Sequence, residues 1–322
     1  MRLLVVIVNY RTAQLTIDCL RSLAPQVPLL PTGTRVVVTD NASGDDSVER
    51  LTKEVRQNGW EGWCEIRPLA RNGGFAYGNN EAIRPALESS DPPEYVLLLN
   101  PDTVVREGAV RALVDFMDAN PNVGIAGSRL EDPDGRPQRS AFRFPGVLSE
   151  LETGLRLSVA SRLLSRFVVA PPPPTEVCRV DWVAGASMII RKGVFDAVGP
   201  LDERYFMYYE EVDFCLRASR AGWPCWYVPD SRVVHLVGQS SGVTDEKKPK
   251  KRRPAYWFES RRRYFVSHLG RARTFAANTL WVLGHAFYRA TVVARRKPAN
   301  DPAMLLRDFI RYNFLPGGRR AA

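Results

Sequence analysis

Apolar and polar residues alternate along the first 130 positions with two different periods. Short runs rich in β-branched residues predict strands at residues 3–8, 35–39, 64–67, 95–99 and 123–126. Stretches with the spacing of an amphipathic helix lie between them, at residues 15–23, 47–55, 76–87 and 108–117. This alternation predicts an α/β fold with a mostly parallel sheet and helices on both faces. The continuous apolar run VLLL at residues 96–99 supports burial of the sheet on both sides.

The pattern of apolar and polar residues changes after residue 127. Residues 131–137, EDPDGRP, predict a turn, and a helical stretch over 148–167 is followed by four prolines at 171–174. Four prolines exclude both a helix and a central strand, so we expect a surface linker there. Further strands are predicted at residues 179–183, 187–190, 226–228 and 232–235, with a helix beginning at Glu210. We therefore predict one α/β domain over residues 1–240 and a basic, helical region over 241–322.

Composition and charge narrow the choice of partner without deciding it. The chain has 322 residues, 45% of them hydrophobic, which suffices for one large core and an appendage. Its net charge of +10 predicts an anionic partner, which can be a phosphorylated substrate, a lipid or a nucleic acid. Five cysteines without CxxC spacing favour a reducing cytosol over a disulfide framework or a zinc site. The first apolar run is too short for a signal peptide, and we expect it to be a strand.

The C-terminal region contains no run of about 18 uncharged apolar residues, so no membrane-spanning helix is predicted. The nearest candidate is residues 275–293, interrupted by His285 and Arg289 and bordered by arginines. Two interpretations stay open for it: a helix that lies in a membrane interface, and an amphipathic helix packed on the α/β domain. The basic run KKPKKRR at residues 247–253 favours an anionic surface as its partner.

Polar residues follow three of the predicted strands. Ligands of open α/β sheets bind beyond the carboxyl ends of the strands, so these residues predict a site: Asn9, Tyr10, Asp40, Asn41, Ser43, Asn100 and Asp102. Singly, each is more typical of a helix cap or a turn. Asp102 directly follows a buried strand, where a carboxylate is suited to hold Mg²⁺ or Mn²⁺ against a diphosphate.

Two other segments carry candidate chemistry. The segment RNGGFAYGNN at residues 71–80 contains Asn72, Gly73 and Gly74 at the start of a helix, where backbone N–H groups can approach an anion. It lacks the GxGxxG spacing of dinucleotide sites. The acidic residues Glu210, Glu211 and Asp213 begin another helix. In a partly dry pocket such carboxylates can accept a proton, and on a surface they only favour the helix dipole.

Six segments in this order resemble the family 2 glycosyltransferases, within them the rhamnosyltransferase-like branch. They are VIVNY, TDNASGD, RNGGFAYGNN, LLLNPD, WVAGASMIIR and FMYYEEVDFCLR, and together they span about residues 3–240. The resemblance implies a GT-A fold, one site for a nucleotide-diphospho-sugar, and inversion at the anomeric carbon. The last eighty residues carry no motif of the family that we can place.

The resemblance also implies roles for individual residues. Asp40 would hydrogen-bond the pyrimidine base, Asp102 would ligate Mg²⁺ or Mn²⁺, and His235 would complete the metal shell or be structural. Asn100 stands where many relatives have an acidic residue, so the ligand set is thinner than in a full DXD motif. Glu211 would be the catalytic base, with Glu210 and Asp213 orienting it or capping the helix. The acceptor side would contain Trp182, Gly185 and Ala186.

The sequence thus predicts an inverting, metal-dependent glycosyltransferase, with dTDP-L-rhamnose as the leading donor. We expect a lipid-linked or glycan acceptor in cell-envelope synthesis. We also expect a cytoplasmic enzyme that is peripheral on the inner face of the cell membrane, with an anionic membrane surface and no nucleic acid as its partner. The sequence leaves a homodimer open. A sugar nucleotidyltransferase would carry a Gly-rich loop with a lysine after the first strand, where this chain has NYRTAQLT. A nucleic-acid-binding protein would explain the pI near 9.6, yet no RNA or DNA motif is present.

Overall fold

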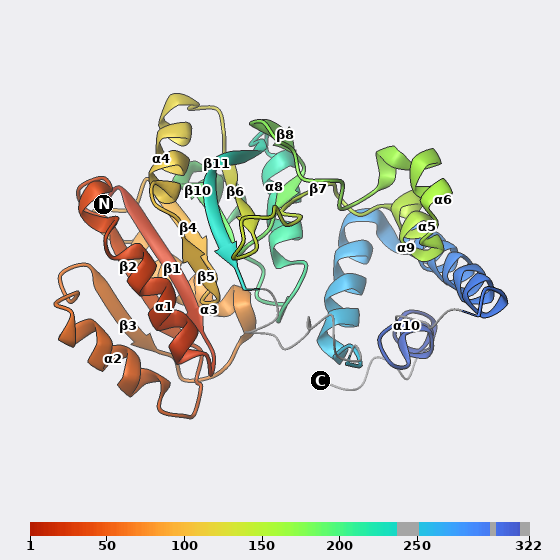
Figure 1. Ribbon diagram of the computed structural model, residues 1–322, viewed down its shortest axis with the longest axis horizontal. Helices are drawn as coiled ribbons and strands as arrows, with labels where there is room; N and C mark the ends of the chain where they lie inside the picture. Colours follow the sequence, from red (N-terminus) through yellow and green to blue (C-terminus); the bar gives the residue numbers. More distant parts are fainter. Residues whose placement is uncertain (237–250, 297–300, 316–322) are drawn as a thin grey trace.

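The computed structural model describes residues 1–236, 251–296 and 301–315. Its first 100 residues alternate strand and helix as predicted (Figure 1). The elements are β1 (Leu3–Asn9), α1 (Ala13–Leu23), η1 (Val27–Leu29), β2 (Arg35–Asp40), α2 (Ser47–Gln57), β3 (Cys64–Pro68), α3 (Gly74–Leu87) and β4 (Tyr95–Leu99). Every residue of β1 and of β4 is buried, which confirms the expectation that helices cover both faces of the sheet.

The second part of the chain is less regular. Its elements up to the last strand are β5 (Thr103–Val105), α4 (Ala109–Ala119), β6 (Ile125–Glu131), β7 (Ala141–Phe142), α5 (Val147–Leu155), α6 (Ser158–Leu163), η2 (Ser165–Phe167), β8 (Cys178–Val180), β9 (Trp182–Val183), β10 (Ser187–Arg191), α7 (Lys192–Val198), α8 (Glu210–Arg220) and β11 (Cys225–His235). Two helices follow, α9 (Ala255–Ala294) and α10 (Leu305–Phe314). The four prolines at 171–174 lie outside helices and strands, as expected.

The large sheet has the strand order β3-β2-β1-β4-β10-β6-β11-β5, and β8 pairs with β11. Strands β3, β2, β1 and β4 are parallel neighbours, as predicted. Strand β10 runs antiparallel to both β4 and β6, so the second half of the sheet is mixed. An apolar run gives the burial of a strand but not its direction, and the sequence therefore left this difference undetected.

Two apolar cores lie on the two faces of the sheet. One contains side chains of α1, α2 and α4, and the other contains side chains of α3, α7 and α8. The consecutive residues Leu97, Leu98 and Leu99 of β4 point alternately into the two cores, and each is at most 1% exposed. Burial of each such side chain stabilises the fold by about 1.5–3 kcal/mol. This rigid sheet fixes where its strands end.

Strand β11 contains an irregularity that matters for the site. Its pairing register with β6 shifts between Val228 and Arg232, which marks a bulge. Beyond the bulge the strand also pairs antiparallel with β5, and this pairing sets His235 opposite Thr103. The sequence predicted two short strands here, and the structure joins them into one strand that returns to the edge where β4 ends.

The C-terminal helices form a group beside the sheet together with α5 and α6 (Figure 1). Helix α9 is broken at Gly270, whose φ of 78° is a left-handed value. A side chain at Gly154 would lie 2.7 Å from the carbonyl oxygen of Trp281, so glycine permits α5 to pack closely on α9. The helical tail is thus confirmed, but α5 packs with it from the middle of the chain. A domain boundary at residue 240 stays a prediction.

Residues 275–293 have features of both interpretations, packing on the protein and exposure of apolar side chains. One side of this helix is buried, with Ala277 and Trp281 in apolar cores shared with α8 or α10. Phe275, Leu283 and Phe287 on another side are more than half exposed. Within the described residues, none of the helices is both long and apolar enough for a membrane span. Most of the basic run 247–253 lies outside the described residues.

Candidate active site

The ends of β1 and β2 are joined by a buried hydrogen-bond network. Asn9 Nδ2 donates to Asp40 Oδ2 at 2.7 Å, and the Ser43 hydroxyl donates to the same oxygen at 2.5 Å. The Ser43 N–H donates to Asp40 Oδ1 at 3.0 Å. All three residues are at most 2% exposed, so they form a rigid, buried network at this edge of the sheet. Asp40 Oδ1 accepts this one bond and has a second lone pair that can accept another.

Tyr10 and Arg11 lie next to this network, directly after β1. Tyr10 is 40% exposed, and the Arg11 guanidinium lies 5.3 Å from the centre of its ring. Arg11 adopts a left-handed φ of 56°, and its backbone N–H and Nε both donate to Ser43. Sequence reasoning singled out Tyr10 and overlooked Arg11. The signal was its place in the same polar stretch after the first strand, where a cation suits an anionic ligand.

The glycine segment has a packing role that the sequence did not predict. The N–H of Gly73 donates to Asn41 Oδ1 at 3.3 Å, and the N–H of Gly74 donates to Asn72 Oδ1 at 3.0 Å. Protein side chains thus accept from both N–H groups in this structure, and a role of the segment in binding the donor stays a prediction. A Cβ on Gly74, whose φ is 87°, would lie 1.9 Å from the carbonyl oxygen of Phe206. These glycines therefore serve close packing between the start of α3 and the segment before α8.

Asp102 and His235 come together from distant parts of the chain. Asp102 is 1% exposed, and its Oδ1 lies 3.5 Å from Nε2 of His235. The pairing of β5 with β11 holds the two residues in register, and the N–H of Leu236 donates to the Asp102 carbonyl at 2.9 Å. Gln138 Nε2 also donates to the His235 carbonyl at 2.9 Å. The two residues that the sequence proposed as metal ligands are thus neighbours.

The first turn of α8 follows two residues in an unusual backbone conformation. Tyr208 and Tyr209 both have φ of 70°, and for such residues a left-handed conformation costs about 1–2 kcal/mol each. The surroundings hold this segment in place: Phe206 accepts a backbone hydrogen bond from Phe75 at 2.8 Å, and the Tyr209 ring packs 5.4 Å from that of Tyr264. Strain of this kind is typical of functional sites. Here it sets the positions of Glu210 and Glu211.

Glu210 and Glu211 form a pair of carboxyl groups with raised pKa values. Burial raises the pKa of Glu211 to about 7. Burial, together with the nearby charge of Glu211, raises the pKa of Glu210 well above its ordinary range. In each, Oε2 is buried and has no hydrogen-bond partner among the described residues. A carboxyl group with a pKa near 7 is suited to general-base chemistry at neutral pH.

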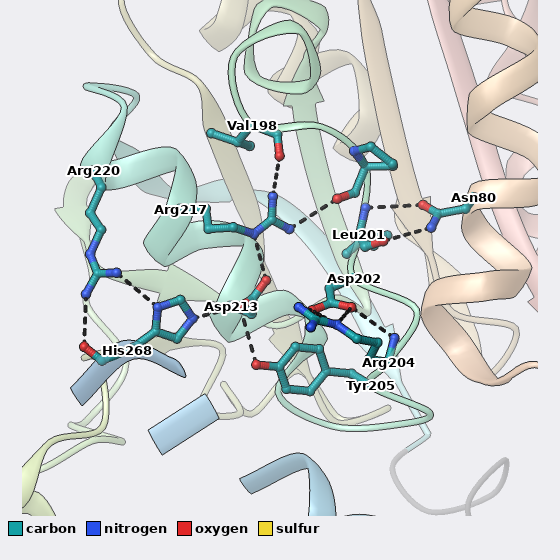
Figure 2. Close-up of polar contacts among 11 residues, drawn as sticks. Asn80, Val198, Leu201, Asp202, Arg204, Tyr205, Asp213, Arg217, Arg220 and His268 are labelled. Carbon is teal, nitrogen blue, oxygen red and sulfur yellow. Dashed lines mark hydrogen bonds and ion pairs between the residues drawn. The ribbon is translucent and has the colours of Figure 1, made fainter. Parts of the chain in front are cut away.

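Asp213 lies in a different environment (Figure 2). Its oxygens contact Arg217 Nε at 2.7 Å, His268 Nε2 at 2.7 Å and the Tyr205 hydroxyl at 3.4 Å. Burial opposes its charge, but the hydrogen bonds from His268 and Arg217 outweigh this effect and lower its pKa. Positions 211 and 213 of a helix face different directions. Asp213 therefore joins α8 to α9, and its place with Glu210 and Glu211 in the catalytic group stays a prediction.

His268 is a residue to which the sequence gave no role. Its Nε2 binds Asp213, and its Nδ1 lies 3.0 Å from Arg220 Nη1 (Figure 2). We call Asp213, Arg217, Arg220, Tyr205 and His268 the α8–α9 joint. No local pattern could have revealed it, because His268 and Asp213 are 55 residues apart and meet only through tertiary packing.

The loop before α8 is also fixed from α3. Asn80, which is fully buried, donates from Nδ2 to the Leu201 carbonyl at 2.8 Å and accepts from the Leu201 N–H at 3.2 Å (Figure 2). Arg217 donates to the carbonyls of Val198 and Pro200. The second asparagine of the GNN segment is thus a positioning residue for the loop that leads to Glu211.

The predicted acceptor residues link the two acidic sites. The N–H of Asn100 donates to the Ala186 carbonyl at 3.0 Å. The adjacent Gly185 is so placed that a Cβ on it would lie 3.8 Å from Cβ of Glu211. Asn100 is two residues from Asp102, so these contacts connect the segment that carries Asp102 with Glu211. The segments that carry the two carboxylates are therefore neighbours.

Trp182 is partly committed to packing. Its ring stacks on Phe142, with centroids 4.1 Å apart and an interplanar angle of 16°, and its Nε1 donates to the Arg143 carbonyl at 2.9 Å. It also packs against two apolar cores. One ring face is thus covered by Phe142, and a sugar-stacking role for the other face stays a prediction.

Comparison with protein families identifies the architecture to which these residues belong. The family model described as glycosyl transferase family 2 matches residues 4–163. The model described as glycosyl transferase family group 2 matches residues 95–295, more than half of the chain. The chain belongs to the family 2 glycosyltransferases. It is therefore an enzyme of glycosyl transfer, and this conclusion replaces the nucleotidyltransferase and nucleic-acid-binding alternatives. The second match also extends through α9, where sequence reasoning had found no motif.

Relatives of this glycosyltransferase include several with named activities. It is 28% identical over 222 residues to the N-acetylglucosaminyl-diphospho-decaprenol L-rhamnosyltransferase of Mycobacterium tuberculosis, covering 64% of this chain and 68% of that protein. It is 29% identical to the rhamnosyltransferase WbbL of Escherichia coli, over 51% of this chain and 61% of the relative. It is 28% identical to the dTDP-rhamnosyl transferase RfbF of Shigella flexneri, over 64% and 61%. The chain matches less than two thirds of the length of WbbL and RfbF.

Solved structures agree on the fold of this glycosyltransferase. The mannosyltransferase PcManGT from Pyrobaculum calidifontis, in complex with GDP-Man and Mn²⁺, aligns with a TM-score of 0.57 at 15% identity, over 99% of this chain and 82% of that one. S. aureus TarS 1–349 aligns with a TM-score of 0.54 at 15% identity, over 97% and 79%. The predicted GT-A fold is thereby confirmed.

The candidate ligands Asp102 and His235 of this glycosyltransferase fit a divalent cation if the substrate completes its coordination. In the described part of the chain, no cluster of three or more His, Cys, Asp or Glu residues could hold a metal ion alone. Asp102 and His235 offer one carboxylate and one imidazole. Mg²⁺ and similar ions are commonly bound by one or two carboxylates and completed by substrate phosphates and water, and imidazole favours Mn²⁺ over Mg²⁺. The two residues therefore fit a cation that the donor diphosphate helps to hold.

Proposed function

We propose that the chain is an inverting glycosyltransferase that moves a sugar from a nucleotide-diphosphate donor to a lipid-linked or polysaccharide acceptor in cell-envelope glycan synthesis. L-rhamnose from dTDP-L-rhamnose is the leading donor, since the relatives named above are rhamnosyltransferases. The observation that carries the proposal is the linkage of Asp102 and Glu211 through Asn100, Ala186 and Gly185. A group for the donor diphosphate and a base for the acceptor would thus belong to one site.

Glu211 is the base in this proposal. Inversion is a single displacement in which the acceptor hydroxyl oxygen bonds to the anomeric carbon from the face opposite the diphosphate. As that bond forms, the hydroxyl proton passes to Glu211, and the bonding pair of the departing C–O bond goes to the diphosphate. A pKa of about 7 leaves about half of Glu211 ionised at neutral pH and makes it a strong enough acceptor. Burial and the nearby charge of Glu211 raise the pKa of Glu210 well above its ordinary range, which favours its protonated form and limits the local negative charge.

The donor would bind at the ends of β1, β2 and β4. Asp102 and His235 would hold Mg²⁺ or Mn²⁺, which when bound neutralises negative charge on the leaving diphosphate. Asp40, with its second lone pair on Oδ1, is placed to accept from a pyrimidine base. Tyr10 and Arg11 lie above it, and the support of the site comes from Asn9, Asn41, Ser43, Asn72 and Asn100.

The enzyme would work on the inner face of the cell membrane, held peripherally. Three observations favour this location: the net charge of +10, the exposed apolar side chains of α9, and the decaprenol-linked substrate in the name of the Mycobacterium tuberculosis relative. Each basic residue near an anionic leaflet contributes about 1 kcal/mol to binding.

A thermal-shift panel of nucleotide sugars with and without Mn²⁺ tests the proposal. A ligand that binds only the folded state raises the unfolding midpoint by mass action. We expect a rise with dTDP-L-rhamnose that needs Mn²⁺ and a smaller one with purine-nucleotide sugars. A chain whose midpoint responds to none of the nucleotide sugars in the presence of Mn²⁺ would contradict the proposal.

A further inference from the structure

A cavity of about 320 Å³ lies at the bend of α9, outside the candidate active site. Its lining comes from both halves of α9 and from α10, and includes Arg262, Arg271, Thr274, Phe275, Asn278 and Asn313. None of the described residues that line it is acidic. The described lining is therefore cationic, and the size of the cavity accommodates a phosphate group with its neighbouring atoms.

The second half of α9 begins at this cavity. Gly270 interrupts the helix, and the Thr274 hydroxyl donates to the Gly270 carbonyl at 2.7 Å. The N–H groups in the first turn of a helix have no acceptor within the helix, and the helix dipole is positive at this end. Arg271 and Thr274 lie in this first turn and line the cavity. An anion in the cavity would thus meet both arginine charge and a helix N-terminus.

Asn278 supplies a second, independent sign of a ligand. It is 3% exposed, and its Oδ1 accepts a hydrogen bond from Arg261 Nη1 at 2.7 Å. Because arginine has only donors, this contact fixes the oxygen toward Arg261 and turns Nδ2 away from it. Among residues 1–236, 251–296 and 301–315, the hydrogen bond of Asn278 runs to its Oδ1 and none has Nδ2 as its donor. Since Asn278 lines the cavity, this donor is placed to meet a ligand there.

Arg261 holds this orientation firmly. Its Nη2 donates to Glu150 Oε2 at 2.6 Å. Its guanidinium lies 4.4 Å and 4.6 Å from the ring centres of Phe265 and Phe309. A guanidinium buried between two rings and paired with a carboxylate cannot rotate freely, so the Asn278 amide is preset toward the cavity.

An exposed apolar stripe starts at the cavity. Phe275 lines it and is 63% exposed, and the stripe continues along α9 with Leu283, Phe287 and Val293, which are 60%, 54% and 72% exposed. Exposed arginines at positions 271, 273 and 289 are on the same helix. A helix that pairs an exposed apolar face with arginines is typical of one that lies in the plane of a membrane interface.

We propose that the cavity binds the phosphate group of an anionic membrane lipid, whose chains pack against the apolar stripe of α9. This inference rests on the membrane location in the proposed function and adds a defined lipid site to it. Arg271, the helix N-terminus and Asn278 Nδ2 are the recognising groups. They would position the enzyme on the leaflet at a fixed orientation, which diffuse attraction between charges does not provide.

Three full-length variants test the lipid site, each lowering the net charge by one. Arg271→Gln and Asn278→Asp alter the cavity, and Arg273→Gln is the control because Arg273 is exposed two residues away and does not line it. Binding is measured by co-sedimentation with vesicles of phosphatidylcholine that contain a minority of phosphatidylglycerol. We expect about a 5-fold loss for Arg273→Gln from its surface charge. The two cavity variants lose a further factor of about 10, as for a hydrogen bond to a charged group.

Other outcomes overturn the lipid site. Equal losses in all three variants would mean diffuse attraction to the vesicle surface. If inorganic phosphate alone stabilises the wild type as much as the vesicles do, the cavity is a site for soluble phosphate. All three variants should keep the Mn²⁺-dependent thermal shift with nucleotide sugar. Failure of that shift in the wild type would overturn the proposed function and leave the vesicle result intact.

Discussion

The two sides of the first turn of α8 carry the same kind of side chain in opposite environments. On the cleft side, Glu210 and Glu211 have raised pKa values and a buried oxygen each without a partner in the described part of the chain. On the side of the α8–α9 joint, Asp213 is bound by Arg217, His268 and Tyr205, and its pKa is lowered. Two residues along one helix separate these environments.

The difference separates groups that support the fold from groups available for chemistry. Partners stabilise the charge of Asp213, so this carboxylate contributes to stability. Burial destabilises the charge of Glu211, and the backbone N–H groups of Glu211 and Val212 offset this only in part, so the charged form lowers the stability of the fold. Strongly shifted carboxyl groups in a cleft are candidates for catalysis, whereas paired ones are structural. Each prediction below tests whether the two sides can be altered independently.

Asp102→Ala should have the largest effect, because it removes one of the two groups proposed to hold a cation against the diphosphate. Loss of such an electrostatic element commonly lowers the rate by about 10² to 10³. Steady-state transfer assays measure the rate, and circular dichroism checks that the variant is folded. Arg106→Ala is a nearby control, since Arg106 pairs with Glu131, which is not a predicted site residue. A folded Asp102→Ala enzyme with near-normal turnover would remove Asp102 from the site.

Asp213→Asn should act on stability rather than chemistry. Loss of its charged hydrogen bonds should cost about 1.5–3 kcal/mol of unfolding free energy at neutral pH. Because its folded pKa is lowered, this stabilisation is present above its ordinary pKa of 3.8 and is lost as pH falls through the folded value. Urea unfolding at several pH values should show the difference between wild type and variant narrowing in acid. A large loss of turnover with unchanged stability would place Asp213 with the catalytic pair after all.

The pH dependence of kcat/KM should follow Glu211. Its carboxylate form is the base, so activity rises with pH through its pKa of about 7 and falls about tenfold per unit well below it. The rate profile of the wild type between pH 5 and 9, at saturating Mn²⁺, measures this. An activity that stays flat down to pH 5 would exclude a base with this pKa.

The smallest effect concerns stability on the cleft side. A carboxyl group whose folded pKa lies above its unfolded value destabilises the fold once pH exceeds the unfolded value, here 4.5. The shift of its pKa from 4.5 to about 7 sets an upper bound of about 3 kcal/mol at pH 8, which solvent screening of this partly exposed residue lowers. Glu211→Gln should therefore be more stable than wild type at pH 8, by about 1 kcal/mol or about 2 °C in Tm, and the difference should vanish below pH 4.5. A variant that is less stable than wild type at pH 8 would show that Glu211 supports the fold.

The sequence predicted what local pattern controls. The apolar runs of β1, β2 and β4 determined where those strands end, and the polar residues after them therefore lie at one edge of the sheet. Glu211 was assigned by resemblance, and its burial could not be read from its neighbours in sequence. The residues that hold it, such as Asn80 and the left-handed Tyr208 and Tyr209, act through contacts that no local pattern specifies.

Tertiary packing decided the rest. The antiparallel course of β10 and the packing of α5 on α9 depend on how distant segments meet. Gly74 looked like part of an anion cradle, because a glycine at a helix start permits both close packing and close approach of a ligand. Only the position of the Phe206 carbonyl distinguishes the two. His268 likewise gained a role only once α9 was placed beside α8.

The most direct test of the central claim compares donor binding with turnover in Glu211→Gln. Glutamine keeps the shape of the side chain but cannot take the acceptor proton, so the variant should bind nucleotide sugar with Mn²⁺ as tightly as wild type and transfer no sugar above background. Calorimetry measures the first and a transfer assay the second. Normal turnover by Glu211→Gln would contradict the claim that Glu211 is the base in the cleft shared with Asp102.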